Sequence, residues 1–137
     1  AKEALADAPH QPLLVAVTVL TSMGQEDLVE LGCHDEPIDR VCQLAALAQE
    51  AGLDGVVCSA AEAAVLSARQ RAGFLLVTPG IRQAGDAAGD QRRIVTPEQA
   101  VSAGATHLVI GRSITESRDP ADTAAQIRAA LNAQGSG

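Results

Sequence analysis

Two arginines stand where they could bind a phosphate group. Arg82 comes shortly after the apolar stretch 74–78, and Arg112 directly follows Gly111 at the end of the apolar stretch 107–111. A guanidinium can hold two phosphate oxygens at once, and a glycine lets a phosphate approach the backbone closely. The two segments therefore predict a phosphate-binding site. An ion pair between Arg112 and a nearby acidic residue is the alternative that the sequence leaves open.

Two more polar side chains could contact the same ligand. Gln91 lies in the long loop 83–93, and its amide offers both a donor and an acceptor. A loop of this length is often a lid or a binding loop, although Gln91 could equally be a solvated side chain. Thr21 and Ser22 end the first apolar stretch with two hydroxyls, and Ser22 could instead cap a helix.

The sequence shows no evident catalytic groups to accompany this predicted phosphate-binding site. The single lysine is Lys2, close to the start of the chain, and no pair of carboxylates flanks it. Cys33 and His34 stand side by side, but no second ligand pair follows at zinc spacing, so no metal site is predicted. The three cysteines show no C-x-x-C spacing, which favours a reducing cytoplasm over a disulfide framework.

Composition limits the kinds of partner. The chain has 137 residues and a net charge of −7, which argues against nucleic acid and membrane surfaces as partners because both require a basic patch. Two or three local arginines are still enough for a small phosphorylated ligand. Hydrophobic residues make up 47% and aromatic residues 1%, which is typical of a parallel sheet covered by alanine-rich helices. No apolar run is long enough to span a bilayer.

The elements that position these residues alternate regularly. After a helix tail at 2–7, we expect strands at 13–20, 54–58, 74–78 and 107–111, and helices at 25–31, 38–51, 60–71, 97–103 and 120–132. Capping boxes are predicted at Ser22/Gln25, Ser59/Glu62 and Thr96/Gln99.

This order predicts an α/β fold with four parallel strands joined by right-handed crossovers. The continuous apolar run at 13–20 is typical of a strand buried on both faces, and ligands should bind at the carboxyl edge of the sheet. We expect one domain over 1–133 and a disordered tail over 134–137. A complete (β/α)8 barrel needs about 250 residues, so a whole barrel does not fit.

The chain closely resembles the bacterial orotidine 5′-phosphate decarboxylase family. The segments that carry the resemblance occur in the family's order along nearly the whole chain: 16–23 (AVTVLTSM), 52–59 (GLDGVVCS), 77–82 (VTPGIR), 89–93 (GDQRR), 110–114 (IGRSI) and 119–120 (DP). The resemblance implies the (β/α)8, or TIM-barrel, fold, with four βα units here that correspond to strands five to eight.

The family's activity would follow from that resemblance. Members are carboxy-lyases that convert orotidine 5′-phosphate (OMP) to UMP and carbon dioxide in pyrimidine biosynthesis, and they act as cytoplasmic homodimers without cofactor or metal. Thr21 would bind the pyrimidine, and Arg82 and Gln91 would belong to the loop that closes over the phosphate. Gly111 and Arg112 would complete the phosphate site.

One departure from the family is large. The family's catalytic lysine and aspartates form an Asp-x-Lys-x-x-Asp pattern in the first half of the barrel, and this sequence lacks that pattern. We therefore expect the chain to be the phosphate- and pyrimidine-binding half, inactive without an N-terminal half barrel. The alternative is a non-catalytic half barrel that binds nucleotides or phosphate and associates with itself.

Overall fold

The structure is a computed structural model, and it describes residues 2–5, 7–82 and 95–134. It contains one sheet of four parallel strands in the order β1-β2-β3-β4. The strands are β1 (Val15–Val17), β2 (Gly55–Val57), β3 (Leu75–Thr78) and β4 (His107–Leu108). The predicted α/β fold with four parallel strands is therefore confirmed.

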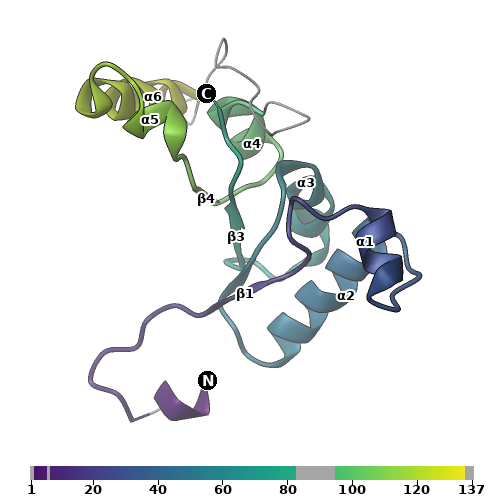
Figure 1. Cartoon of the computed structure of the whole chain (residues 1–137). Coiled ribbons are helices and arrows are strands. Elements are labelled where there is room, and N and C mark those ends of the chain that lie inside the picture. Colours follow the sequence, from purple (N-terminus) through teal and green to yellow (C-terminus); the bar gives the residue numbers. More distant parts are fainter. Residues whose placement is uncertain (1, 6, 83–94, 135–137) are drawn as a thin grey trace.

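Helices connect the strands. In chain order they are the 3-10 helix η1 (Glu3–Leu5), α1 (Gln25–Glu30), α2 (Pro37–Glu50), α3 (Ala60–Arg69), α4 (Pro97–Ser102), α5 (Arg112–Thr115) and α6 (Pro120–Gln134). Helix α2 packs on β1 and β2, and α3 packs on β3, so both lie on one side of the sheet (Figure 1). Helix α6 packs against α4 and α5.

Local sequence signals explain where most helices begin. The backbone N–H of Glu62 donates to the Ser59 hydroxyl, and the Glu62 carboxylate accepts from the Ser59 N–H, so the predicted capping box of α3 is confirmed. Thr96 and Gln99 form the same reciprocal pair at α4. Pro37 occupies the first turn of α2, where its missing N–H costs no hydrogen bond.

The predicted cap of α1 was wrong. The N-cap residue is Gly24, not Ser22, and the Gly24 N–H donates to Oδ2 of Asp27 at 2.7 Å. Asp27 thus satisfies the backbone from inside the first turn, and its carboxylate sits where the helix dipole favours negative charge. A pattern that looks only for a hydroxyl before the helix misses this arrangement.

Element ends also differ from the sequence-based expectations. The strands are shorter than predicted, and the expected first helix tail is the single 3-10 turn η1. Three residues separate β4 from the short helix α5, which was not predicted from the sequence. Helix α6 extends to Gln134, the first residue of the expected disordered tail, and 135–137 lie outside the described residues.

The core lies between the sheet and the helices on its covered side. Alternate strand residues turn toward these helices, and Val56, Cys58, Leu76 and Thr78 are almost fully buried there. Opposite them, α2 and α3 contribute small and branched side chains, including Val41, Ala45, Ala63 and Leu66. Alanine at these positions lets the helices approach the sheet closely.

The other face of the sheet is open. Val15 and Val17 of β1 are 40% and 57% exposed, although Ala16 between them packs against the core. The expectation that the first strand is buried on both faces was therefore wrong for this chain. Among the described residues, a single layer of helices covers one face of the sheet, and a parallel sheet needs cover on both faces to bury such strands.

Candidate ligand-binding site

The two arginine-bearing segments leave neighbouring strands at the same edge of the sheet. β3 pairs with β4 in parallel, with Thr78 opposite Leu108. Beyond that pair, the N–H of Val109 donates to the carbonyl oxygen of Thr78 at 2.9 Å, so the two chains still run side by side as they leave the sheet. Arg82 and Arg112 each follow four residues or fewer after this contact. The structure thus brings their backbones to one sheet edge, as predicted.

The Arg82 segment is anchored through Ile81 and through the backbone N–H of Arg82. Ile81 is 3% exposed and forms an isolated parallel bridge with Val95. The Arg82 N–H then donates to the carbonyl oxygen of Val95 at 3.1 Å. Gly80, with a φ of 77°, makes the turn that a residue with a side chain would rarely adopt. The bridge positions the backbone of Arg82. It could not be predicted from the sequence, because the long loop separates Ile81 from Val95.

The Gly111–Arg112 segment is open to solvent. Both residues are exposed, and an added Cβ on Gly111 would meet nothing within 4 Å among the described residues. Packing within this part of the chain therefore gives no reason for a glycine there. The backbone beside Arg112 is therefore exposed at this edge, and its contact with a phosphate stays a prediction.

Thr21 lies farther along the same edge. It is exposed in the turn that follows β1, where the Met23 N–H donates to the Leu20 carbonyl oxygen at 2.9 Å. Strand β2 separates β1 from β3, so at the usual strand spacing Thr21 begins about 10 Å from the strand that leads to Arg82. Gln91, the remaining predicted contact, lies outside the described residues.

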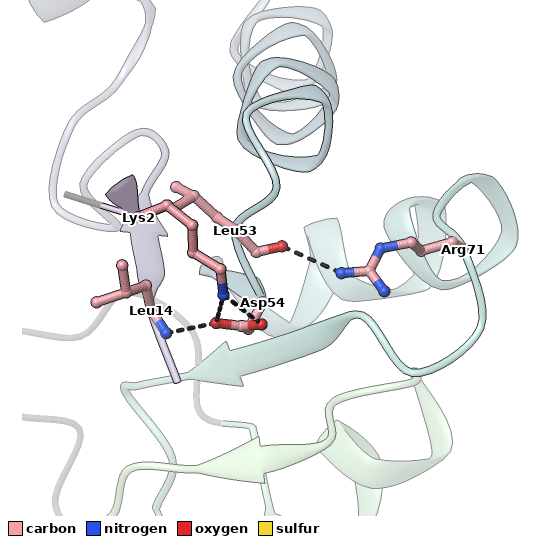
Figure 2. A network of polar contacts seen from close by, with 5 residues as sticks. All are labelled: Lys2, Leu14, Leu53, Asp54 and Arg71. Carbon is pink, nitrogen blue, oxygen red and sulfur yellow. Dashed lines mark hydrogen bonds and ion pairs between the residues drawn. The ribbon is translucent and has the colours of Figure 1, made fainter. Parts of the chain in front are cut away.

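The single lysine is placed at the opposite edge of the sheet. Lys2 Nζ lies 3.0 and 2.8 Å from the two carboxylate oxygens of Asp54, directly before β2 (Figure 2). The Leu14 N–H also donates to Asp54 at 2.7 Å, and these hydrogen bonds hold the pKa of that carboxyl below its usual range. Because ligands of parallel α/β folds bind at the carboxyl edge, this Lys–Asp pair lies away from the candidate site.

Arg71 completes the polar contacts at this amino edge. Its guanidinium donates to the Leu53 carbonyl oxygen at 3.2 Å and lies 5.8 Å from the ring centre of Phe74 (Figure 2 shows the first contact). Neither contact was predicted from the sequence. They tie the start of β3 to the residue before Asp54, which is a structural role.

The described residues include no evident cysteine nucleophile and no evident metal site. Cys58 is fully buried at the end of β2, and burial raises the pKa of its thiol to about 11. Such a thiol is almost entirely protonated at neutral pH and is a poor nucleophile. Within the described ranges, no group of three or more His, Cys, Asp or Glu side chains could hold a metal ion. Nor is any described helix long and apolar enough to cross a membrane.

Comparison with known proteins decides the family. The model of the orotidine 5′-phosphate decarboxylase / HUMPS family matches residues 1–127. The chain belongs to this family. The orotidine 5′-phosphate decarboxylase of Salmonella typhi is 57% identical over 132 residues, and that of Teredinibacter turnerae is 54% identical over 127 residues. The resemblance drawn from the sequence is thereby confirmed.

Solved structures of the family agree. The crystal structure of orotidine 5′-phosphate decarboxylase from Lactobacillus acidophilus matches with a TM-score of 0.79 at 36% identity, covering 96% of this chain and 55% of that one. The predicted membership of the TIM-barrel family is thereby confirmed, with four βα units present here.

Coverage of the relatives is partial. The alignments cover 96% and 93% of this chain but only 54% and 55% of the Salmonella and Teredinibacter proteins. The chain thus spans about half the length of the curated relatives that it matches.

Proposed function

We propose that this chain is the phosphate- and pyrimidine-binding half of an orotidine 5′-phosphate decarboxylase, a carboxy-lyase that converts OMP to UMP and carbon dioxide. The observation that carries the proposal is the family match over residues 1–127, joined to two arginine-bearing segments that leave adjacent strands at one edge of the sheet. No feature of the structure favours the alternative of a non-catalytic nucleotide-binding module.

The phosphate would be bound by Arg82, Gly111 and Arg112, with Gln91 as a further contact. Each guanidinium offers a planar pair of donors to phosphate oxygens, and the exposed backbone at Gly111 leaves room for close approach. The chain's net charge of −7 does not exclude an anionic ligand at these arginines, because salt screens distant charges beyond about 10 Å.

The pyrimidine would lie toward Thr21. An elongated ligand suits this arrangement, since Thr21 and the arginines leave different strands along the same edge. The phosphate is remote from the carbon that loses carbon dioxide, so its binding energy must be used to hold the ring in place and to exclude water.

The groups that act on the reacting carbon would come from outside these 137 residues. Departure of carbon dioxide leaves a carbanion on the ring, which needs a nearby cation and a proton donor. Lys2, the single lysine, is engaged by Asp54 at the far edge of the sheet and is not placed for that role. We propose that an N-terminal half barrel supplies the catalytic lysine and aspartates, and that the complete enzyme is a cytoplasmic homodimer.

A chimera provides the test. The matching half of the Salmonella typhi relative is replaced by this chain, and kcat/KM for OMP decarboxylation is measured. We expect an active enzyme in which Arg112→Ala lowers kcat/KM by about 100-fold, equivalent to about 2.7 kcal/mol of lost contact with the phosphate. Arg128→Ala, which removes an exposed arginine from α6, is the matched control and should leave activity unchanged.

The same chimera also separates binding of the phosphate from other roles of Arg112. Affinity for UMP should fall with Arg112→Ala, whereas affinity for uridine, which lacks the phosphate, should not change. A folded chimera in which Arg112→Ala leaves UMP affinity intact would contradict the phosphate assignment. A folded but inactive chimera would contradict the proposed function.

A further inference from the structure

Thr78 ends β3 with a hydroxyl that is closed off from water. Its side chain is 0% exposed, and among the described residues it is the one polar side chain that is buried. No nitrogen or oxygen atom in this part of the chain forms a hydrogen bond with the hydroxyl. A buried hydroxyl with a poor partner lowers stability, and valine would fill the same space without that cost. Packing alone therefore does not explain a threonine at this position.

The polar group beside this hydroxyl is the thiol of Cys58. The strand register pairs Val57 with Val77, so the next residue on each strand, Cys58 and Thr78, lies on the same helix-covered face. The Cys58 N–H donates to the Val77 carbonyl oxygen at 3.0 Å and extends the strand pairing to this point. Burial raises the pKa of the Cys58 thiol, and a hydrogen bond with the Thr78 hydroxyl opposes part of that rise. The two side chains thus link the carboxyl ends of β2 and β3.

Both arginine-bearing segments leave the sheet from Thr78. Along the chain, Thr78 is the last residue of β3, and Pro79 has no N–H with which to continue the strand pairing toward Arg82. Across the sheet, the Thr78 carbonyl oxygen accepts from the Val109 N–H at 2.9 Å, three residues before Arg112. A displacement of Thr78 therefore moves the point from which each segment starts.

We propose that Thr78 is a positioning residue of the phosphate site, whose buried hydroxyl holds the end of β3 against β2 so that Arg82 and Arg112 start at a fixed separation. Thr78 acts through the backbone, because its own side chain is enclosed beneath the helices. The contact of a guanidinium with a phosphate depends on its direction, so a small displacement of either starting point weakens the contact. This role rests on the proposed function, since it concerns the geometry of the same site.

The test compares UMP with uridine as ligands of the chimera described above. The ratio of the two affinities measures contact with the phosphate, and a general loss of folded protein leaves it unchanged because both ligands are affected equally. Thr78→Val removes the hydroxyl and keeps the shape, so it should lower the ratio about tenfold while the free energy of unfolding is kept or raised. Thr78→Ser keeps the hydroxyl and loses a methyl group, so it should lower the free energy of unfolding and leave the ratio intact.

Thr106→Val is the matched control, at the amino edge of the same two strands. The Thr106 hydroxyl accepts from the Leu76 N–H at 2.9 Å and donates to the Leu76 carbonyl oxygen at 3.2 Å, so it also ties β4 to β3. Its loss should lower the free energy of unfolding without changing the affinity ratio. Cys58→Ala removes the partner of the Thr78 hydroxyl. It should lower the ratio by itself, and it should lower it no further when combined with Thr78→Val.

The outcomes separate this role from a purely structural one. An affinity ratio that Thr78→Val leaves unchanged would overturn the proposal, as would an equal fall with Thr78→Ser or with Thr106→Val. If Thr78→Val does not fold, Cys58→Ala decides, and an unchanged ratio in that variant would count against the role of Thr78. A folded, unsubstituted chimera that binds UMP no better than uridine would contradict the proposed function, and the positioning role with it.

Discussion

The ammonium nitrogen of Lys2 lies 2.8 Å from Oδ2 of Asp54, a residue 52 positions later in the chain. The same carboxylate accepts a hydrogen bond from the backbone of Leu14, just before β1. One side chain therefore connects the N-terminal segment, the start of β1 and the start of β2 at the amino edge of the sheet (Figure 2). In barrels of this kind the amino edge serves stability, while the carboxyl edge carries the site.

The stability that Asp54 provides should depend on pH. The hydrogen bonds from Lys2 and Leu14 lower the pKa of Asp54 in the folded chain below its usual value of 3.8. A lowered folded pKa stabilises the fold fully above the unfolded value and loses that effect as the pH falls through the folded value. Asp54→Asn should therefore reduce the free energy of unfolding near neutral pH, and the difference from the unsubstituted chain should shrink below about pH 4.

Urea denaturation at a series of pH values measures this effect. Glu3→Gln, which removes an exposed carboxylate from the same N-terminal segment, is the control and should not show the same pH-dependent gap. A gap between the Asp54→Asn variant and the unsubstituted chain that stays constant down to about pH 2 would contradict the role given to the carboxylate charge.

Gly55 should not tolerate a side chain. A Cβ at this position would overlap the carbonyl oxygen, Cα and Cβ of Leu75 on the neighbouring strand, and the backbone of a central strand cannot move aside. Gly55→Ala should lower the free energy of unfolding by about 3 kcal/mol, at the upper end of typical overpacking costs. Thermal or urea unfolding measures the loss.

The control for Gly55 is Gly24→Ser. Gly24 caps α1 with a φ of −108°, and the nearest atom to an added Cβ is Oδ2 of Asp27 at 3.9 Å. This substitution should be neutral or slightly stabilising because serine is a good N-cap residue. Equal losses at Gly24 and Gly55 would show that the close strand approach is not the cause.

Periodic and local signals in the sequence predicted most of the fold. The apolar runs at each strand and the capping pairs Ser59/Glu62 and Thr96/Gln99 depend on neighbours a few residues apart, so they are readable without tertiary information. The placement of Arg82 and Arg112 at one edge followed from the parallel topology alone.

Contacts between distant residues could not be predicted in the same way. No sequence pattern predicts that Lys2 pairs with Asp54 or that Ile81 pairs with Val95. Charged and apolar residues occur at many other positions that could equally have been their partners. The open face at Val17 was missed for a related reason. An apolar run indicates that a strand will be buried, but it does not say which chain buries it.

The two confirmed capping boxes should each contribute measurably to stability. Ser59→Ala and Thr96→Ala remove the hydroxyls that accept from Glu62 and Gln99, so each should cost about 1 kcal/mol of unfolding free energy. Ser59→Asp should restore most of the loss, since a carboxylate also accepts from the backbone. Ser67→Ala, an exposed hydroxyl within α3 that bonds its own helix backbone at Ala64, is the control and should cost little or nothing.

The buried thiol of Cys58 should report on unfolding of the sheet. Burial raises its pKa to about 11, so about one molecule in a thousand carries the thiolate at pH 8, and the fully buried sulfur is also shielded from reagent. In a disulfide-exchange assay at pH 8, the half-buried Cys33 and Cys42 should react first. Cys58 should react only at the rate at which the core opens, and low urea concentrations should accelerate it. Cys58→Ala should therefore remove the slow phase and leave the two faster phases intact. Three thiols that react at similar rates in native buffer would mean that β2 is not packed beneath α2 as described.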